Sequence, residues 1–286
     1  MDKRIGVTLV IGAAVVSGFS IFLNKFGVSD FNPFVFTTLK NSVVAVFLFS
    51  MIFLLGEHKK LRSLLPRQWG QLALIGLVGG SIPFLLFFYG LSLTSAVNAG
   101  FLQKTLFIWA MIFAAIFLKE GIGIKLLAGA LLLLAGNFVL FSKFTSFGAA
   151  DAMILAAAIL WGAENVISKK ALGETYGRIV AFGRMFFGSL FMLAFLAATG
   201  QAPDIASISA GQAAWVIITG GMLFLYVLLY YTGLKYVSVG VATALLSLAQ
   251  PITAILSMAF SGSHFSVGDA FGFLLIFTGS ATILWL

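Results

Sequence analysis

The sequence predicts an all-α membrane protein of ten transmembrane helices, built as two inverted five-helix repeats with both the N- and C-termini in the cytoplasm. Of its 286 residues, 61% are hydrophobic and only 9% are charged, whereas a soluble domain is roughly half apolar and a quarter charged. A helix needs about 20 mostly apolar residues to cross a bilayer. Spans of that length joined by short loops use nearly the whole chain, so we expect no soluble domain.

Window hydropathy, with the Gly, Pro and charged residues between apolar runs, places the spans. The first apolar run begins at Ile5 and continues to about Phe26, which is longer than the roughly 7 to 15 residues of a signal-peptide core. It is therefore interpreted as a span. The expected spans are residues 5–26, 33–55, 70–92, 96–118, 124–142, 150–169, 178–199, 212–234, 238–260 and 267–286.

Lysine and arginine residues between the spans predict the orientation, because cytoplasmic loops carry an excess of them. With the N-terminus inside, only Lys25 and Lys143 fall on the outer side. The net charge of +8 is thus attributed to topology and not to nucleic-acid binding. The cations expected inside are Lys3, Arg4, Lys59, Lys60, Arg62, Arg67, Lys119, Lys125, Lys169, Lys170, Arg178 and Lys235.

An internal repeat relates residues 1–143 (spans 1–5) to residues 144–286 (spans 6–10). A displacement of 144 residues, with a one-residue slip later, aligns like residues. Five spans, an odd number, separate equivalent positions, so each helix runs opposite to its partner; such inverted repeats suit alternating access. The alternatives are shared membrane composition or a duplication that only stabilises the bundle. Aligned pairs include Gly18 with Gly162, Lys25 with Lys169, Lys40 with Arg184, Gly90 with Gly233, Ala99 with Ala242, Gly129 with Gly272 and Gly136 with Gly279.

Short motifs carry a resemblance to a known family. They are Leu160-Trp161-Gly162 with Lys169 and Lys170 at the end of the same helix, Lys40 or Arg184 early in the next, Leu118-Lys119-Glu120, and residues 233–238 (GLKYVS) before a helix that contains Pro251. The chain resembles the drug/metabolite transporter superfamily in its ten-span EamA-like form, and most of all the YddG-type exporters of amino acids and related metabolites. The resemblance covers essentially the whole chain and implies a secondary exporter in a bacterial inner membrane.

Two departures from the family pattern limit what the resemblance implies. His264 stands where the second half should have a Glu, and Phe107 stands where Pro251 should have its counterpart. These differences put strict functional symmetry in doubt. The substrate is not inherited either, because the superfamily also exports sugars, nucleosides and drugs.

Lys104 is the most informative polar residue within a span, because a charge near the bilayer centre is tolerated chiefly when it faces a bundle interior or water. Gln103 precedes it and Asn98 lies about a turn and a half earlier. These residues are predicted to form a cavity wall that meets a substrate carboxylate. Pairing of Lys104 with backbone carbonyls, or snorkelling to the interface, is the alternative.

Glu164 is the acidic residue well inside a span, and it shares a helix face with Trp161. It is predicted either to bind a substrate amine or proton, or to form an ion pair with Arg184 that merely neutralises two buried charges. Lys40 is expected to snorkel to the outer interface.

The remaining candidates for a pocket are aromatic and polar residues in the spans. Trp161 and Trp109 carry an N–H that needs a partner, and each aromatic residue taken singly could instead be packing. Pro83 and Pro251 interrupt spans and are predicted to allow gating bends; the alternative is a helix kink that has no role in transport. The further cavity candidates are Tyr89, Asn165, Tyr226, Tyr230, Ser247 and Gln250.

Several function classes are disfavoured. The chain has no Cys, its two His residues, His58 and His264, fall in loops, and no nucleotide-binding G-x-x-x-x-G-K-[ST] motif occurs. We expect no enzyme, catalytic residue, metal or cofactor. The expected partners are a small-molecule substrate and membrane lipid, without nucleic acid, in a monomer or weak homodimer. Facilitated efflux is favoured over proton coupling, and a passive pore or lipid flippase is the competing class.

Overall fold

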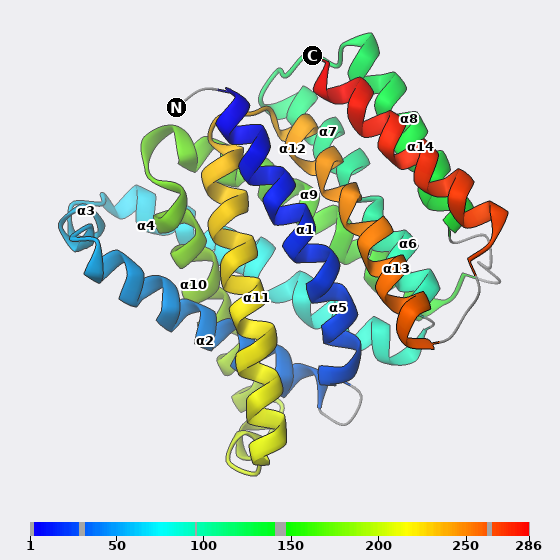
Figure 1. Ribbon diagram of the computed structural model, residues 1–286. Helices are drawn as coiled ribbons and strands as arrows, with labels where there is room; N and C mark the ends of the chain where they lie inside the picture. The colour runs from blue at the N-terminus through cyan, green and yellow to red at the C-terminus, as the bar shows by residue number, and fades with distance from the viewer. Residues whose placement is uncertain (1–2, 29–31, 95, 141–146, 262–264, 286) are drawn as a thin grey trace.

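The protein is a bundle of packed helices (Figure 1). The computed structural model describes residues 3–28, 32–94, 96–140, 147–261 and 265–285, and all regular structure in these ranges is helical. Nine helical segments there are long and apolar enough to cross a membrane, and the shorter apolar helix α8 brings the set to the expected ten.

Seven of the ten spans are single uninterrupted helices, whereas the other three consist of shorter helices laid end to end. The single helices are α1 (Lys3–Val28), α2 (Pro33–Leu54), α9 (Ala149–Glu174), α10 (Gly177–Ala198), α11 (Ala210–Leu234) and α14 (Val267–Leu284), together with the shorter α8 (Ile124–Leu140). The composite spans are α4 (Pro66–Ile75), η1 (Gly76–Ser81) and α5 (Ile82–Leu93); α6 (Ala96–Lys104) and α7 (Leu106–Phe117); and α12 (Val239–Leu245), η3 (Leu246–Leu248) and α13 (Ala249–Ser261).

Two expected boundaries are wrong by several residues. The third span begins at Pro66 instead of residue 70, and the sixth continues to Glu174 instead of ending at 169. Both extensions carry charged residues beyond the apolar run, which hydropathy excludes. The two longest connections also contain short helices, α3 (His58–Arg62) and η2 (Ala202–Ile205). The expected ends at residues 142 and 286 lie outside the described residues.

The breaks within spans have different causes. The segment η1 is a π-helix that leads directly to Pro83 in the first turn of α5, and proline supplies no N–H to the helix ladder. Pro251 follows η3 in the first turn of α13. The break at Thr105, between α6 and α7, has no proline, and the Thr105 hydroxyl instead donates to the Leu102 carbonyl at 2.7 Å. A proline is therefore not required for this kind of break.

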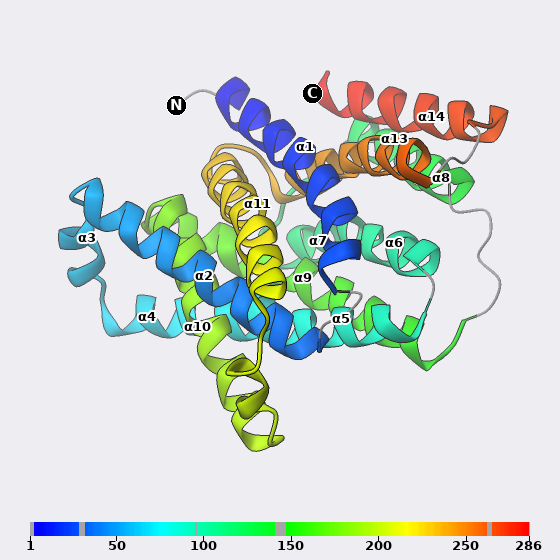
Figure 2. The same ribbon diagram turned by 60° about the horizontal axis from the view of Figure 1, so that its bottom comes forward.

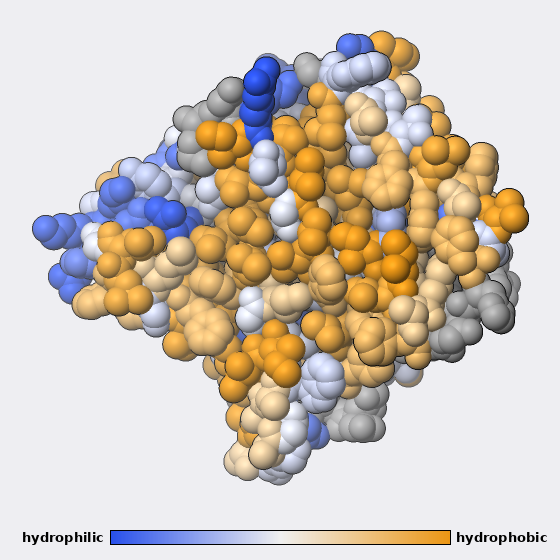
Figure 3. Space-filling view, in the orientation of Figure 1, coloured by the Kyte–Doolittle hydropathy of each residue, from blue (hydrophilic) through white to orange (hydrophobic). Residues whose placement is uncertain are grey.

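The two ends of the bundle differ in charge. The end carrying α3, the α9–α10 connection and the α11–α12 connection, called the basic end below, holds Lys59, Lys60, Lys169, Lys170 and Lys235. Figure 3 shows hydrophilic residues gathered over α3, with apolar residues across most of the remaining face. At the opposite end, α2, α11 and α14 begin with side-chain caps from Asn32, Ser209 and Ser266, which satisfy N–H groups that a helix leaves unpaired.

Two of the close glycine contacts in the bundle are alike. A Cβ at Gly18 of α1 would lie 2.7 Å from the Ile252 Cβ, and a Cβ at Gly162 of α9 would lie 2.8 Å from the Trp109 Cβ. The displacement of 144 or 143 residues that aligns the halves relates the members of these two contacts. The α1–α13 and α9–α7 crossings thus resemble each other in their glycine contacts. Helix α1 lies between α11 and α13 in both views (Figures 1 and 2).

A second pair of crossings shows a similar likeness. A Cβ at Gly90 would lie 2.8 Å from the Ala150 carbonyl oxygen, and a Cβ at Gly233 would lie 2.8 Å from the Gly6 carbonyl oxygen. Gly90 aligns with Gly233 and Ala150 with Gly6. Helices α5 and α9 therefore approach each other as α11 and α1 do.

Gly188 allows α10 to reach η1 at backbone distance, since a Cβ there would lie 2.5 Å from the Gly80 carbonyl oxygen. We predict that Gly188→Ala forces these segments apart and destabilises the protein by about 1 to 3 kcal/mol, as overpacking does. Thermal unfolding in detergent measures the effect. Gly221→Ala is the matched control, because a Cβ at Gly221 of α11 meets nothing within 4 Å. Equal melting temperatures for the two variants would contradict this packing.

Candidate functional site

A cavity of about 830 Å³ lies between the helices. Its wall runs from Arg184 and Tyr231, toward the basic end, to Leu140 and Asp269, at the opposite end of the bundle. Residues of both halves line it. The cavity therefore reaches the end of the bundle that carries few cations.

Most of the residues predicted for a pocket lie in this wall. Tyr89 does not; it is 40% exposed and stacks on Phe34. Trp109 packs at Gly162, and its indole N–H donates to the Thr105 hydroxyl at 3.3 Å. Pro83 also lies outside the wall, as does Pro251, and the side chain of Asn98 lies outside the described residues. The predicted residues in the wall are Gln103, Lys104, Trp161, Glu164, Asn165, Tyr226, Tyr230, Ser247 and Gln250.

Lys104 ends α6 and faces the cavity. Its ammonium group has no hydrogen-bond acceptor or carboxylate partner within the part of the chain that the structure describes. The proposed pairing with backbone carbonyls is therefore not formed. A cation in this position is available to a ligand.

The π-helix η1 organises the cavity floor through one carbonyl group. The Gly79 carbonyl oxygen accepts a hydrogen bond from the Trp161 indole N–H at 3.0 Å and another from Arg184 Nη2 at 3.1 Å. A Cβ at Gly79 would lie 2.2 Å from Glu164 Cγ, so only glycine leaves room for this glutamate. The π-helix η1 thus contacts both α9 and α10, and Gly79 leaves space for the Glu164 carboxylate.

Of the two alternatives for Glu164, the ion pair with Arg184 is not formed. Its Oε1 accepts hydrogen bonds from the Tyr231 hydroxyl, at 2.7 Å, and from the Ser168 hydroxyl. No ion pair within 4.0 Å joins Glu164 to a cation among the described residues. Arg184 instead donates from Nη2 to the Gly79 carbonyl of the π-turn, and its Nε is buried without an acceptor among the described residues. Hydropathy and spacing give no sign of that carbonyl.

The other polar residues of the floor are held in a fixed arrangement. The Tyr230 hydroxyl donates to Asn165 Oδ1 at 2.5 Å, and Asn165 Nδ2 donates to the Trp161 carbonyl at 2.8 Å. Tyr226 stacks on Tyr230 with ring centroids 5.6 Å apart. Gln250 Nε2 is buried without an acceptor among the described residues. This side of the cavity combines aromatic faces with polar tips, as small-molecule sites do.

The expectation that Lys40 snorkels to the interface is wrong. Lys40 is only 2% exposed and lies in the cavity wall. Its ammonium donates to Asn24 Oδ1 at 3.2 Å and lies 4.6 Å from the ring centroid of Phe88 and 5.0 Å from that of Phe36. Cation–π contacts and one amide stabilise the buried charge. The alignment of Lys40 with Arg184, which also lines the cavity, was the signal for this position.

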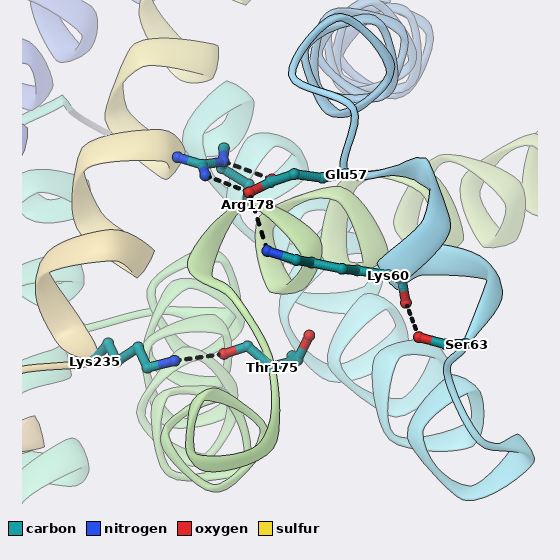
Figure 4. Close-up of polar contacts among 6 residues, drawn as sticks. All are labelled: Glu57, Lys60, Ser63, Thr175, Arg178 and Lys235. Carbon is teal, nitrogen blue, oxygen red and sulfur yellow. Dashed lines mark hydrogen bonds and ion pairs between the residues drawn. The ribbon is translucent and has the colours of Figure 1, made fainter.

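Polar contacts seal the basic end (Figure 4). Arg178 donates two hydrogen bonds to the Glu57 carboxylate, at 2.9 and 2.6 Å, which ties α10 to the α2–α3 connection. The Lys60 ammonium lies 3.9 Å from the same carboxylate and 3.8 Å from the ring centroid of Tyr176. Lys235 donates to the Thr175 carbonyl at 2.9 Å.

Two motif residues with no role assigned from sequence complete this seal. Lys169 donates to the carbonyl groups of Leu234, Lys235 and Val237, at 2.7, 3.1 and 2.7 Å. The Glu120 carboxylate accepts from the Val239 backbone N–H at 3.0 and 2.9 Å, and so caps α12. Lys169 thereby holds α9 to the end of α11, and Glu120 joins the end of α7 to the start of α12. The motif spacing quoted above was the available signal, although it named no partners.

Comparison with known proteins identifies the family. The EamA-like transporter family model matches residues 4–142 and again residues 148–285. The chain belongs to the EamA-like transporter family. This EamA-like protein is 29% identical over 271 residues to a Fusobacterium nucleatum protein named riboflavin transporter ImpX, covering 89% of each chain. It is 26% identical over 253 residues to an uncharacterized transporter of Clostridium kluyveri, covering 83% of this chain and 81% of the relative.

A solved crystal structure shares the fold of this EamA-like protein. The TM-score is 0.81 at 18% sequence identity, with 99% of this chain and 96% of the other covered. Family, composition and helix lengths together make the chain a multi-pass membrane transporter of the drug/metabolite superfamily.

The Glu57–Arg178 pair makes a pH-dependent contribution to stability. The hydrogen bonds from Arg178 lower the pKa of the Glu57 carboxyl, so the contribution is complete above its ordinary pKa of about 4.3 and is lost as the pH falls through the lower, folded-state value. We predict that Glu57→Gln lowers the free energy of unfolding by about 1 to 3 kcal/mol at neutral pH, with a smaller effect at acid pH.

Melting curves at both pH values measure this difference. Glu174→Gln is the control, because Glu174 meets Arg67 only at 3.9 Å on the surface, where ion pairs contribute little. Destabilisation by Glu57→Gln that is equal at both pH values would refute the assignment.

Proposed function

We propose that this EamA-like protein is a secondary carrier that exports small metabolites bearing a carboxylate, amino acids first, across a bacterial inner membrane by alternating access. The observation that carries the proposal is the ammonium group of Lys104, which faces an 830 Å³ cavity without a partner among the described residues. A charge in the bilayer interior is expensive unless it faces water or a ligand. Its position therefore indicates an anionic group on the substrate.

The charges in the cavity wall favour a carboxylate that is part of a zwitterion. Lys40, Lys104 and Arg184 exceed Glu164 and Asp269 by one positive charge. Both hydroxyl donors to Glu164 bond the same oxygen, Oε1, so Oε2 is available to a substrate amine. The arrangement suits a carboxylate at Lys104 and an ammonium group at Glu164, as in an amino acid.

Alternating access requires two halves that can exchange packings, and we propose that residues 1–143 and 144–286 are inverted repeats. The repeated glycine contacts at Gly18 and Gly162, and at Gly90 and Gly233, support this relation, as does the match of the family model to each half. The basic end is assigned to the cytoplasm by the positive-inside rule, with both termini on that side. The seal there and the cavity at the other end correspond to an outward-facing state.

A second candidate substrate is a planar heterocycle. One relative is named a riboflavin transporter, and aromatic side chains line the cavity beside Trp161: the rings of Phe84 and Phe87 lie 5.4 and 5.5 Å from it. Stacking between such faces would hold a flat ring. A competition panel in proteoliposomes, with amino acids, riboflavin, nucleosides, sugars and cationic drugs, separates the candidates.

The finer assignments rest on the same site. The YddG-type subgroup is proposed from the motif resemblance, and facilitated efflux is favoured because Glu164 is the single acidic group at the cavity floor. A monomer or weak homodimer is proposed. Saturable, stereoselective flux supports a carrier, whereas flux that does not saturate would favour the passive pore or lipid flippase.

We predict that Lys104→Met lowers transport of carboxylate substrates about tenfold or more, since a buried hydrogen bond to a charged group contributes about 1.5 to 3 kcal/mol. Lys104→Arg should restore part of the activity because it keeps the charge. Counterflow in proteoliposomes measures both. Lys119→Met, which removes a cation outside the cavity wall, is the control. Unchanged transport by Lys104→Met would remove this residue from the site.

We predict that Glu164→Gln weakens uptake of amino acids while sparing analogues that lack the amine, because the amide cannot pair with an ammonium group. If Glu164 instead carries a proton, the variant loses the pH dependence of efflux. Transport of matched amine and des-amino substrates at several pH values distinguishes the roles. A loss equal for both substrates at every pH would show that Glu164 only supports the floor through Tyr231.

A further inference from the structure

A second hollow, of about 570 Å³, lies on the side of the bundle at the basic end, between α4, α7 and α9. Its depth is apolar, with Leu74 on α4, Phe113 and Phe117 on α7, and Ile167 on α9. Leu74 is 45% exposed and Phe117 is 61% exposed. The hollow is therefore an open groove on the surface that faces lipid, separate from the transport cavity.

Two cationic residues, Arg67 on α4 and Lys170 on α9, line the groove near the basic end. Lys170 is exposed and has no hydrogen-bond or ion-pair partner within the described ranges. The Arg67 side chain is 86% exposed and approaches Glu174 only to 3.9 Å. A Cβ at Gly70, between them and the apolar depth, would meet nothing within 4 Å. Arg67, Lys170 and Glu174 together leave one net positive charge at the entrance of the groove, next to its apolar residues.

The equivalent place in the other half carries aromatic rings in place of the cation. A displacement of 144 residues places Phe26 where Lys170 stands and Phe22 where Val166 stands. There the Phe22 and Phe26 rings lie 5.0 Å apart, and Phe26 stacks on Trp215 with centroids 6.4 Å apart. Aromatic rings thus pack together at one of the two equivalent places, whereas the other is a groove with Arg67 and Lys170 in its wall.

We propose that the groove between α4, α7 and α9 is a binding site for an anionic phospholipid. Its phosphate group is held by Arg67 and Lys170, and one acyl chain lies along Leu74 and Phe117. Arg and Lys between transmembrane helices attract anionic headgroups, at about 1 kcal/mol for each cation near the surface, and a guanidinium matches phosphate geometry. A zwitterionic lipid lacks the net charge, and a free phosphate ester lacks the chain that fills the apolar depth.

The site matters for the seal because it shares two helices with it. Lys170 follows Lys169, whose ammonium holds three carbonyls after α11. Phe117 ends α7, three residues before Glu120, which caps α12. A lipid bound between α7 and α9 therefore contacts the two helices that carry these clamps.

Native mass spectrometry of the full chain in detergent, titrated with phosphatidylglycerol or with phosphatidylcholine of the same chains, tests the proposal. We expect preferential retention of phosphatidylglycerol, and about 30-fold weaker binding in Arg67→Ala/Lys170→Ala. Gly70→Leu should also weaken binding, because it fills the groove without removing charge. Lys59→Ala/Arg62→Ala, which removes two exposed cations from α3, is the matched control.

The results distinguish lipid binding in the groove from binding through surface charge or through the phosphate group alone. An equal loss in the α3 control would mean that surface charge alone binds the lipid, and the groove assignment would fail. It would also fail if both lipids bound equally or if glycerol 3-phosphate displaced phosphatidylglycerol at similar concentration. Arg67→Gln/Lys170→Gln, which retains long side chains, replaces the alanine pair should that variant not fold.

Discussion

The carbonyl oxygen of Gly79 is the acceptor on which the cavity floor depends. In a bilayer, a backbone polar group without a partner costs several kcal/mol, so a freed carbonyl must be bonded within the protein. The π-helix η1 directs this carbonyl to Trp161 and Arg184 together. It thus fixes the side of α9 that faces the cavity, and with it the position of Glu164. Arg184 therefore forms no ion pair with Glu164, the one carboxylate at the cavity floor.

The charged residues at the two ends of the bundle differ in whether they have bonding partners within the protein. At the basic end, Lys169 and Glu120 satisfy the backbone groups between α11 and α12, and Arg178 holds Glu57. Toward the other end, Lys104 is left without a partner among the described residues and the helices separate around the cavity. Charged residues are therefore bonded within the protein at one end, whereas toward the other end Lys104 faces the cavity. The difference lies in whether a backbone carbonyl or carboxylate is within reach.

Much of the fold could be predicted because the bilayer fixes helix length. Apolar runs gave the number of spans, and errors arose at Pro66 and Glu174, where helices continue past the apolar run. The residues that line the cavity were harder to predict from the sequence. Lys104 and Glu164 were predictable because charge is excluded from lipid, but Trp109 and Tyr89 were misplaced, since an apolar helix has no polar face to indicate its orientation. Lys40 was misjudged because Phe88 and Asn24, which stabilise its ammonium group together with Phe36 of the same helix, come from other helices. Partners such as the Gly79 carbonyl depend on tertiary packing alone.

The most direct test of alternating access around this cavity is the labelling of Ser17→Cys with a membrane-impermeant maleimide from each side of oriented vesicles. Ser17 lines the cavity, and the chain has no cysteine to give background. We predict rapid labelling from the side opposite the basic end, slowed by a transported substrate. Adding Lys169→Met, which weakens the seal, should raise labelling from the basic end. Labelling from the basic end that is unaffected by Lys169→Met and by substrate would contradict the account.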